Sequence, residues 1–471
     1  MSQPLEIIRP PALAPGATLG VFTPSTPANV HFREKYRHGL SQIEALGFRW
    51  IEGDLTASCE HQGYRTSGPR ERAAELMSLI ANPDVSAVVS TIGGMNSSSL
   101  IPYLDFDVVR ANPKVLVGFS DVTSLHLAFL AHAGVSTFYG PAVMPSFGEW
   151  PEMLVETRDS FLDAVWRHTH GARRLAMPSR WSNHFRDARG DAWRTVEREW
   201  NRSDGWRVLL PGRASGELVV ANLNTLVAAA GTPYFPSVDG VILLIEEMSA
   251  PLALEERSLR QLERMGVFDR IAGLIVGRPE FYDQQGAPFG YDEIILEIVG
   301  DRGYPIVVDV DCGPTVPMLT LAERTPITLE AYATPASIVV ERPMVVGDAG
   351  RMIYHFAPSA DVNAARERGI YRHASLERDG FIHCSPSDLV CHVATVNARG
   401  RGDLVLVEID SERVDARIVW ENLEGGSRVF PHIYGELPMR AVTRVLGFPP
   451  DDDGSFRLPV ALSGGLPAHT R

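Results

Sequence analysis

The chain has 471 residues, 45% hydrophobic and 22% charged, which predicts a soluble globular protein of two to four domains. Its net charge of −14 argues against nucleic-acid binding and against an anionic membrane surface, because both require clustered lysine and arginine. The four cysteines form no Cys-x-x-Cys pair, and no run is long enough to cross a membrane. Since the first residues also lack an apolar signal segment, we expect a cytoplasmic protein with neither metal nor cofactor.

Strands alternate with helices over residues 1–150, which predicts an α/β domain with a mostly parallel sheet. Helices are predicted at 32–46 and 71–79. The strand that follows runs into Gly93 and Gly94. Glycines at a strand end can bring backbone N–H groups close to a ligand, although a glycine pair more often marks an ordinary turn.

A strand, a sharp turn and a helix are predicted in succession over residues 114–130. The apolar run from Val115 to Val117 indicates a buried strand, Gly118-Phe-Ser-Asp121 breaks it, and leucines at helical spacing follow. This pattern is related to the Gly-x-Ser-x-Gly elbow, which lifts a serine hydroxyl out of a sheet towards a substrate. The helix N-terminus beneath Ser120 would favour an oxyanion. The alternative is that Ser120 only caps the helix.

Residues 151–214 form a long connector whose polar second half is rich in tryptophan. Such aromatic density predicts either a lid that stacks on a ring of the substrate, or rings that fasten the insertion to the core. The tryptophans are Trp181, Trp193, Trp200 and Trp206.

A second α/β unit is predicted over 215–345, and its central strand ends in Glu246. A carboxylate at that edge of a sheet is well sited for chemistry, with a surface rim as the alternative. A small α/β unit follows over 350–446, and 447–471 is expected to be a mobile acidic tail. The small unit carries polar residues that could line a pocket or, less commonly, bind metal: His355, His383, Ser385, His432 and Tyr434.

Residues from about 10 to 345 resemble the LD-carboxypeptidase family of serine peptidases, closest to its microcin C immunity branch. The resemblance implies a two-lobed α/β body with a parallel-sheet N-terminal lobe and a smaller C-terminal lobe, and it implies a homodimer. It is carried by Thr91-Ile-Gly-Gly-Met-Asn96, Asn112-Pro-Lys-Val-Leu-Val-Gly-Phe-Ser-Asp121, Thr137-Phe-Tyr-Gly-Pro141, Ser215-Gly-Glu-Leu-Val-Val-Ala-Asn222 and Leu244-Ile-Glu-Glu247.

The resemblance also implies a Ser-His-Glu triad, with Ser120 as nucleophile and Glu246 as its acidic member. Backbone N–H groups of Gly94 and Asp121 would hold the oxyanion. The implied substrate is a small peptide- or aminoacyl-nucleotide, whose nucleotide-like end the insertion would bind. The residues expected to contact this substrate are Gly93, Asn96, Asn222, Trp193, Trp200 and Trp206.

One departure from the family pattern concerns the general base, because Pro314 stands where the family has its histidine. Proline cannot accept a proton, so triad chemistry should fall by several orders of magnitude. Three explanations are open. In the first, the domain is a binding protein that has kept the pocket and lost turnover. In the second, another base takes the place of histidine, such as Asp311, Glu323 or a histidine of the third domain. In the third, the change from histidine to proline is recent or artificial.

Residues from about 352 to 445 resemble a small bacterial domain of uncharacterised function whose implied fold is similar to ADP-ribosyltransferases. Nucleotide binding there is a hypothesis from fold analogy. For the whole chain we expect a serine carboxypeptidase-like hydrolase that cleaves the amide between a C-terminal acidic residue and a nucleotide-like group, in antibiotic immunity or detoxification. The alternatives are a non-catalytic binding protein and a muropeptide L,D-carboxypeptidase.

Overall fold

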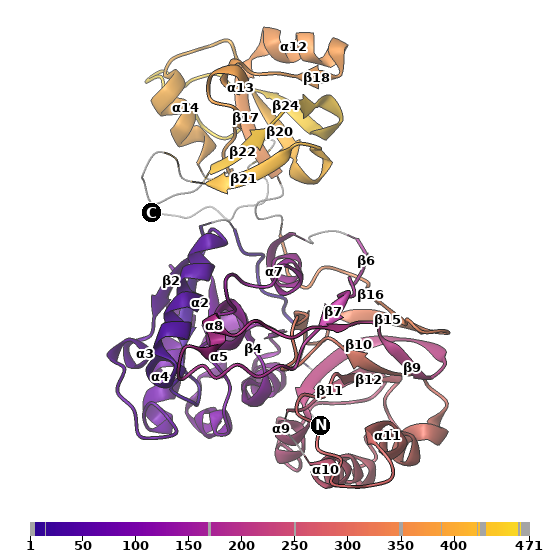
Figure 1. Ribbon diagram of the computed structural model, residues 1–471. Helices are drawn as coiled ribbons and strands as arrows, with labels where there is room; N and C mark the ends of the chain where they lie inside the picture. Colours follow the sequence, from indigo (N-terminus) through magenta and orange to yellow (C-terminus); the bar gives the residue numbers. More distant parts are fainter. Residues whose placement is uncertain are drawn as a thin grey trace. The chain divides into compact units, whose positions relative to one another are not determined.

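The computed structural model describes residues 5–14, 16–167, 171–248, 251–347, 352–387, 389–421, 423, 430–459 and 462 (Figure 1). Its contacts divide the chain into two compact units. The body comprises Met1–Leu13 with Ala17–Gly347, and the small unit comprises Ala14–Gly16 with Asp348–Arg471. Among the described residues, no helix has both the length and the apolar character needed to span a bilayer.

The N-terminal lobe of the body is built on a six-stranded sheet of order β14-β5-β4-β3-β1-β2. All neighbours pair in parallel except β14, an edge strand that comes from the C-terminal part of the body. Buried apolar runs such as β3 and β4 suit a parallel sheet covered on both faces. The strands are β1 (Thr18–Phe22), β2 (Arg49–Glu52), β3 (Ala87–Ser90), β4 (Val115–Gly118), β5 (Phe138–Tyr139) and β14 (Leu321–Ala322), and the helices are α1 (Ala28–His31), α2 (Arg33–Ala45), α3 (Asp54–Ser58), α4 (Pro69–Ala81), α5 (Phe106–Ala111) and α6 (Thr123–Ala128).

The C-terminal lobe is built on an eight-stranded sheet of order β6-β16-β15-β10-β11-β12-β13-β9. Its central strands β10 to β13 pair in parallel, and the outer pairs are antiparallel. The strands are β6 (Arg173–Arg174), β9 (Arg207–Leu210), β10 (Gly212–Asn222), β11 (Ile242–Glu246), β12 (Gly273–Gly277), β13 (Ile306–Val310), β15 (Pro326–Ala331) and β16 (Ser337–Val340), and the helices are α9 (Leu223–Ala228), α10 (Leu252–Arg264) and α11 (Tyr291–Val299).

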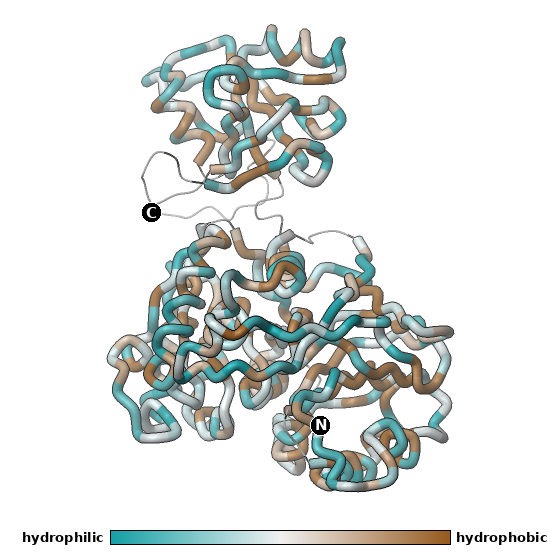
Figure 2. Tube along the Cα trace, in the orientation of Figure 1, coloured by the Kyte–Doolittle hydropathy of each residue, from teal (hydrophilic) through white to brown (hydrophobic). Residues whose placement is uncertain are grey.

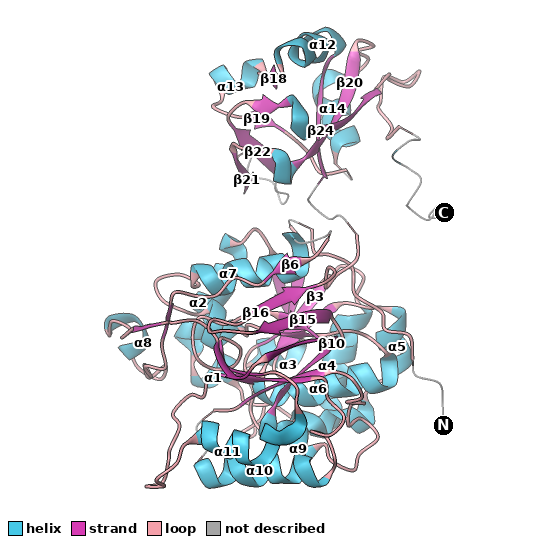
Figure 3. Cartoon of the chain, turned by 90° about the vertical axis from the view of Figure 1, so that its right-hand side faces the viewer, coloured by secondary structure: helices cyan, strands magenta, loops and turns pink. Residues whose placement is uncertain are grey.

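One hydrophobic core is shared by both lobes of the body. It joins Val117 and Phe138 of the first sheet to Val220 and Leu244 of the second. A second core packs the other face of the C-terminal sheet against α9, α10 and α11, which lie side by side in Figure 3. The tube in Figure 2 is brown along β11 and β12, between these two cores. Because one core crosses the lobes, the ends of β4 and β11 are held in a fixed relation. The expected two-lobed α/β body is therefore confirmed.

The insertion crosses from one lobe to the other. It contains α7 (Val155–Leu162), β7 (Arg180–Trp181), α8 (Ala192–Thr195) and β8 (Asn201–Arg202), and it supplies the edge strands β6 and β9. In Figure 1 the segment with α8 and β7 runs along the front of the body. Ser182 is paired in antiparallel fashion with Val316, so the insertion is fastened to the loop that contains Pro314.

The small unit is a mixed α/β domain. Its main sheets have the orders β17-β20-β24 and β19-β22-β21, and β18 pairs with β23. Its elements are β17 (Met352–Pro358), α12 (Ser359–Arg368), β18 (Ile370–Tyr371), α13 (Ala374–Arg378), β19 (Ile382–His383), α14 (Val390–Ala398), β20 (Leu404–Asp410), β21 (Arg417–Glu421), β22 (Phe430–Tyr434), β23 (Leu437–Pro438) and β24 (Val442–Gly447).

The segment that follows β24 is packed on the small unit, which corrects the prediction of a mobile tail. Phe448 and Phe456 are buried in a core with residues of α14 and β20, and their rings lie 4.8 Å apart. Two aromatic side chains therefore hold this segment on the small unit, despite its run of aspartates. Residues 460, 461 and 463–471 of the predicted tail lie outside the described residues.

Candidate active site

Ser120 stands at the turn between β4 and the helical segment that leads into α6. Its φ of +61° lies in the left-handed region, which residues other than glycine seldom adopt and which is common at functional sites. Its hydroxyl has no hydrogen bond to any described residue, and the helix after it lacks a side-chain cap. The side chain instead lines a cavity of about 590 Å³ in the body. These observations favour the elbow over the capping alternative.

The glycine pair lies directly against this turn. A Cβ atom on Gly93 would be 3.1 Å from Ser120 Cβ and 3.3 Å from the backbone N of Asp121. Gly94 has a φ of +152°, and a Cβ there would collide with the hydroxyl of Ser25. Only glycine lets the loop approach so closely. The loop that carries Gly94, an expected oxyanion donor, thus lies against the turn that carries Ser120 and Asp121.

Asp121 and Asn96 fasten the glycine loop to the turn. Asp121 Oδ2 accepts hydrogen bonds from the backbone N–H groups of Asn96 and Ser97, both at 2.9 Å, and from the Ser97 hydroxyl at 2.6 Å. The side-chain oxygen of Asn96 accepts from the buried Arg72 at 2.8 Å. Neither Asn96 nor Asp121 is among the residues that line the cavity. Their hydrogen bonds hold the glycine loop in place against the turn.

Glu246 is the last residue of β11 and is only 2% exposed. Its Oε1 accepts hydrogen bonds from the Tyr139 hydroxyl and, at 3.2 Å, from the Asn222 side-chain amide. The Tyr139 oxygen in turn accepts the backbone N–H of Ser120 at 2.9 Å. Tyr139 therefore links the expected acid to the backbone of the expected nucleophile, a role that sequence reasoning missed. Its position at the end of a buried strand beside β4 was the available signal.

The other oxygen of Glu246 is not paired. Oε2 is buried and has no hydrogen-bond partner among the described residues. Gly313 has a φ of +129°, and a Cβ there would be 2.7 Å from this oxygen. Pro314 follows and lines the cavity together with Ser120 and Glu246. Burial raises the pKa of Glu246 to about 8, so the carboxyl group keeps its proton at neutral pH.

The substitute bases considered from the sequence lie elsewhere. Asp311 is buried and accepts a hydrogen bond from the indole of Trp206 at 2.9 Å. Glu323 is buried against the backbone N–H of Val220 at 3.3 Å. Neither residue lines the cavity. His184 does line it, although sequence reasoning did not single it out.

The insertion lines the cavity through residues 182, 184–189 and 198, and not through its tryptophans. Trp206 is fully buried, Trp193 packs against Trp150 with ring centres 5.7 Å apart, and Trp200 lies under the guanidinium of Arg180 at 4.0 Å. The expectation that these three rings contact the substrate is thus corrected, because they pack within the protein.

Two phenylalanines at the cavity supply aromatic surface instead. Phe185 of the insertion is 66% exposed, and its ring centre lies 5.9 Å from that of Phe281 in the C-terminal lobe. Both rings line the cavity. The contact between these rings joins segments far apart in the chain, so no local sequence pattern could predict it.

One wall of the cavity carries an excess of positive charge. Arg186 and Arg198 both pair with the buried Glu149, and Arg198 Nη2 lies 2.8 Å from its Oε2. Lys35 also lines this wall, and burial lowers its pKa to about 8. These three basic groups outnumber the two carboxyl groups beside them, Glu149 and Glu280, and burial raises the pKa of Glu280 to about 7. The remaining positive charge favours an anionic group on a ligand.

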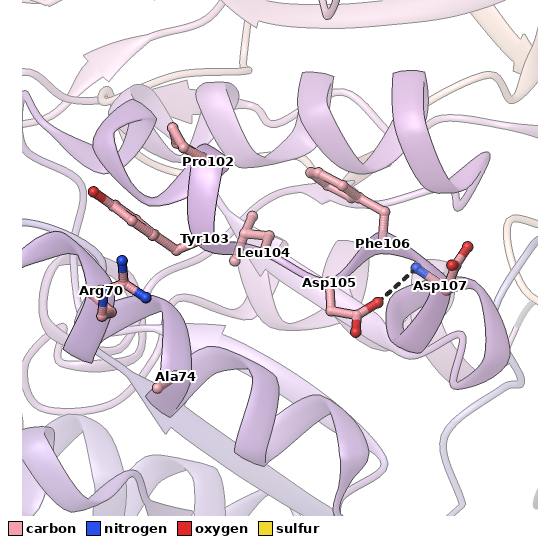
Figure 4. A pocket seen from close by; sticks show the side chains of 8 residues that line it. All are labelled: Arg70, Ala74, Pro102, Tyr103, Leu104, Asp105, Phe106 and Asp107. Carbon is pink, nitrogen blue, oxygen red and sulfur yellow. Dashed lines mark hydrogen bonds between the residues drawn. The ribbon is translucent and has the colours of Figure 1, made fainter.

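A second hollow of about 800 Å³ lies on the N-terminal lobe (Figure 4). The Arg70 guanidinium lies over the ring of Tyr103, 4.8 Å from its centre. Asp105 Oδ1 accepts the backbone N–H of Asp107 at 3.1 Å and so caps α5. The polar side chains of this hollow thus stabilise the local structure, and none of the predicted site residues lines the hollow.

The polar residues predicted to form a pocket in the small unit lie near one another. His355 is buried, with its ring nitrogens 2.7 Å from the carbonyl of His383 and 2.9 Å from the hydroxyl of Tyr371. The rings of His383 and His432 are 5.1 Å apart, and Tyr434 and His432 share the carboxylate of Glu421. The fifth residue, Ser385, is buried and pairs through its backbone with Tyr354. No cluster suited to a metal ion occurs among the described residues.

Comparison with known families matches three parts of the chain. Residues 19–140 match the LD-carboxypeptidase N-terminal domain, and residues 215–329 match the LD-carboxypeptidase C-terminal domain. Residues 356–445 match a domain described only as a protein of unknown function, DUF952. The last match leaves the expected similarity to ADP-ribosyltransferases without support.

Individual relatives agree with these matches. A putative carboxypeptidase of Vibrio cholerae is 36% identical over 317 residues, which cover 65% of this chain and 90% of the relative. The microcin C7 self-immunity protein MccF of Escherichia coli is 34% identical over 323 residues, covering 66% and 89%. A solved structure of MccF in complex with aspartyl sulfamoyl adenosine superposes with a TM-score of 0.68 at 32% identity, covering 72% of this chain and 99% of that one.

Proposed function

Because this chain belongs to the LD-carboxypeptidase family, we propose that it is a serine carboxypeptidase-like hydrolase of an acidic aminoacyl-nucleotide. In this proposal Ser120 Oγ attacks the carbonyl carbon of the amide that joins the acidic residue to the nucleotide-like group. The amides of Gly94 and Asp121 hold the developing oxyanion, and Glu246 orients the base. Such a reaction would serve immunity to, or detoxification of, a microcin C-type antibiotic.

The observation that carries the proposal is the connected pair of Ser120 and Glu246. The strained serine faces a cavity, and Tyr139 ties its backbone to the buried carboxyl group. A serine that served only as a helix cap would need neither the strain nor the open side of the cavity. A site of this kind performs acyl transfer when a base completes it.

Two features of the cavity support a substrate with an acidic end and a ring. The cationic wall of Lys35, Arg186 and Arg198 suits carboxylates or a phosphate-like group. The facing rings of Phe185 and Phe281 suit a nucleobase. These features of the cavity support the proposed substrate class, with phenylalanines in the place that we expected for tryptophans.

The test is incubation of the full chain with aspartyl sulfamoyl adenosine, with mass spectrometry of released sulfamoyl adenosine. We expect slow release that Ser120→Ala abolishes, because the nucleophile is lost. A panel of muropeptides separates this substrate class from a murein L,D-carboxypeptidase. Equal release by the native chain and Ser120→Ala would reject serine catalysis.

A second candidate function is non-catalytic binding, which the unpaired Glu246 Oε2 and the proline beside it favour. The cavity would then sequester the aminoacyl-nucleotide intact. This alternative expects a tight complex by calorimetry, recovery of unchanged ligand and the same affinity for Ser120→Ala. Turnover that depends on Ser120 would exclude it.

The small unit and the assembly complete the proposal. By analogy of fold with ADP-ribosyltransferases, the small unit would bind an adenine nucleotide near His355 and His432. A shift in its thermal melting with an adenylate or NAD tests this, and no shift would reject it. We further propose that the protein is cytoplasmic and forms a homodimer. Sedimentation of the full chain tests the dimer.

A further inference from the structure

One carboxylate oxygen of Glu246, Oε2, faces the Gly313–Pro314 loop. Oε1 is fully engaged by Tyr139 and Asn222, whereas Oε2 is buried without a partner among the described residues. An unpaired buried polar atom destabilises the fold, so a site that keeps one commonly has a use for it. Tyr139 bridges Glu246 Oε1 and the backbone of Ser120, and both residues line one cavity. A donor that reached Oε2 beside Gly313 would therefore lie near the nucleophile.

The imidazole of His184 is not prepared to act as the base. The antiparallel pair between Ser182 and Val316 brings His184 towards Pro314, and both line the cavity. Its Nδ1 accepts the backbone N–H of Glu199 at 3.0 Å. In the neutral ring the proton must then be on Nε2, which makes that nitrogen a donor. A base for Ser120 needs a free lone pair there.

Lys35 is the amine among the residues that line the cavity, and its surroundings assign it to the cationic wall. The charges that act on its pKa are those of Glu149, Arg198 and Arg186. Glu149 is already paired with both arginines. Lys35 is thus suited to balance an anionic ligand, and it has no described link to Ser120 or Glu246.

We propose that the missing base is supplied by the substrate itself, as a neutral amine on the carbon next to the scissile carbonyl, held by Glu246 Oε2. This inference rests on the proposed hydrolase function and narrows its substrate class. It assigns the site to aminoacyl compounds with a free α-amine, and it excludes peptidyl or N-acylated forms, whose nitrogen has no basic lone pair.

The chemistry balances with these groups alone. Glu246, as the carboxylate, accepts one N–H of the amine, whose lone pair takes the proton of Ser120 as Oγ bonds to the carbonyl carbon. The ammonium ion then gives that proton to the leaving nitrogen as the carbon–nitrogen bond breaks. Water attacks the acyl-serine in the second half, again losing its proton to the amine, and the proton passes to Ser120 Oγ when the acid is released. No oxidant or other reactant is required.

The test compares two substrates that differ only at the α-amine. Aspartyl sulfamoyl adenosine carries it, and succinyl sulfamoyl adenosine has hydrogen in its place and keeps both carbonyl ends. The full native chain, Pro314→His and Ser120→Ala are each assayed for kcat and KM at pH 8, close to the ordinary pKa of an α-amine, about 7.7–8.0. We expect the native kcat for the succinyl compound to be lower by about 10²-fold or more, as for loss of a general base.

Pro314→His separates this inference from the proposed function. A histidine in the protein makes the substrate amine unnecessary, so its kcat for the two compounds should agree within about tenfold. Similar native kcat values, or a difference confined to KM, would overturn the inference, because the base would then belong to the protein. If the native chain cleaves neither compound, the inference also fails. Activity of Pro314→His would then still uphold the hydrolase, and its inactivity would reject both.

Discussion

Replacing Pro314 with histidine should convert a weak site into an active one. The loop already has the main-chain form that a histidine needs, because Gly313 holds its left-handed φ beside Glu246. An imidazole N–H donated to Glu246 Oε2 would satisfy the one unpaired oxygen. The second ring nitrogen would then be free to face Ser120 across the cavity, as in a triad.

The expected size of the gain follows from the missing base. General-base catalysis contributes about 10²–10⁴-fold, or about 3–5 kcal/mol of barrier. Glu246 must be ionised to orient the ring, and with a pKa of about 8 only about a tenth of it is ionised at pH 7. The new N–H donor favours the ionised form and lowers this pKa. We therefore expect the full gain at pH 8.5 and up to about tenfold less at pH 7.

The assay is kcat/KM for succinyl sulfamoyl adenosine from pH 6 to 9, since this compound brings no amine of its own. Pro314→Ala is the matched control, because it removes the proline ring without adding a base. The double variant Ser120→Ala with Pro314→His reports any reaction that does not use the serine. Circular dichroism establishes that each variant is folded.

Two results would refute the reasoning. An equal gain in Pro314→Ala would show that release of the loop, and not proton transfer, raised the rate. A folded Pro314→His without gain at any pH would show that position 314 does not bridge Glu246 and Ser120.

Three further outcomes are expected. Tyr139→Phe should lower the free energy of unfolding by about 1–3 kcal/mol in urea titration, because it leaves the Ser120 N–H without a buried acceptor and Glu246 Oε1 with the Asn222 amide alone; an unchanged midpoint would argue against this link. The melting temperature should fall between pH 5 and 8.5, because burial raises the pKa of Glu246 and Glu323 from 4.5 to about 8. Over this range both carboxyl groups ionise in the unfolded chain before they do so in the folded one, which favours unfolding as the pH rises. A melting temperature that rises with pH would contradict this prediction. Phe185→Ala should raise the Kd for sulfamoyl adenosine about tenfold by calorimetry, because the phenylalanine ring would stack on the adenine. The Kd for aspartate should not change.

The parts of the site that sequence could predict are those set by neighbours in the chain. A buried apolar strand, a break and a helix place Ser120 at a turn whatever the rest of the molecule does. Glu246 at the end of β11 follows in the same way from one apolar run. Gly93 and Gly94 likewise lie where a strand ends.

The parts that escaped prediction depend on contacts between distant segments. Tyr139 reaches Glu246 across 107 positions, through the packing of two sheets. The cavity wall includes Ser182 of the insertion, which pairs with Val316. Within the same insertion Phe185 is exposed, whereas Trp206 is buried in the shared core. Composition gave the tryptophans prominence, but only the fold decides which rings face a ligand. The aspartates after β24 misled for the same reason, since Phe448 and Phe456 determine how that segment packs.

The protonation of Glu246 explains how the fold accommodates proline at position 314. An ionised buried carboxylate with one unpaired oxygen would be costly, whereas the neutral acid that burial favours is much less so. The shared core and the bonds from Tyr139 and Asn222 hold the acid in position without help from position 314. Glu246 therefore needs no histidine at position 314 to keep its place. A neutral ligand amine that donates an N–H to Glu246 Oε2 would favour the ionised form and lower the pKa of Glu246, so that its proton leaves to solvent as the ligand binds. The amine then keeps its lone pair for the proton of Ser120.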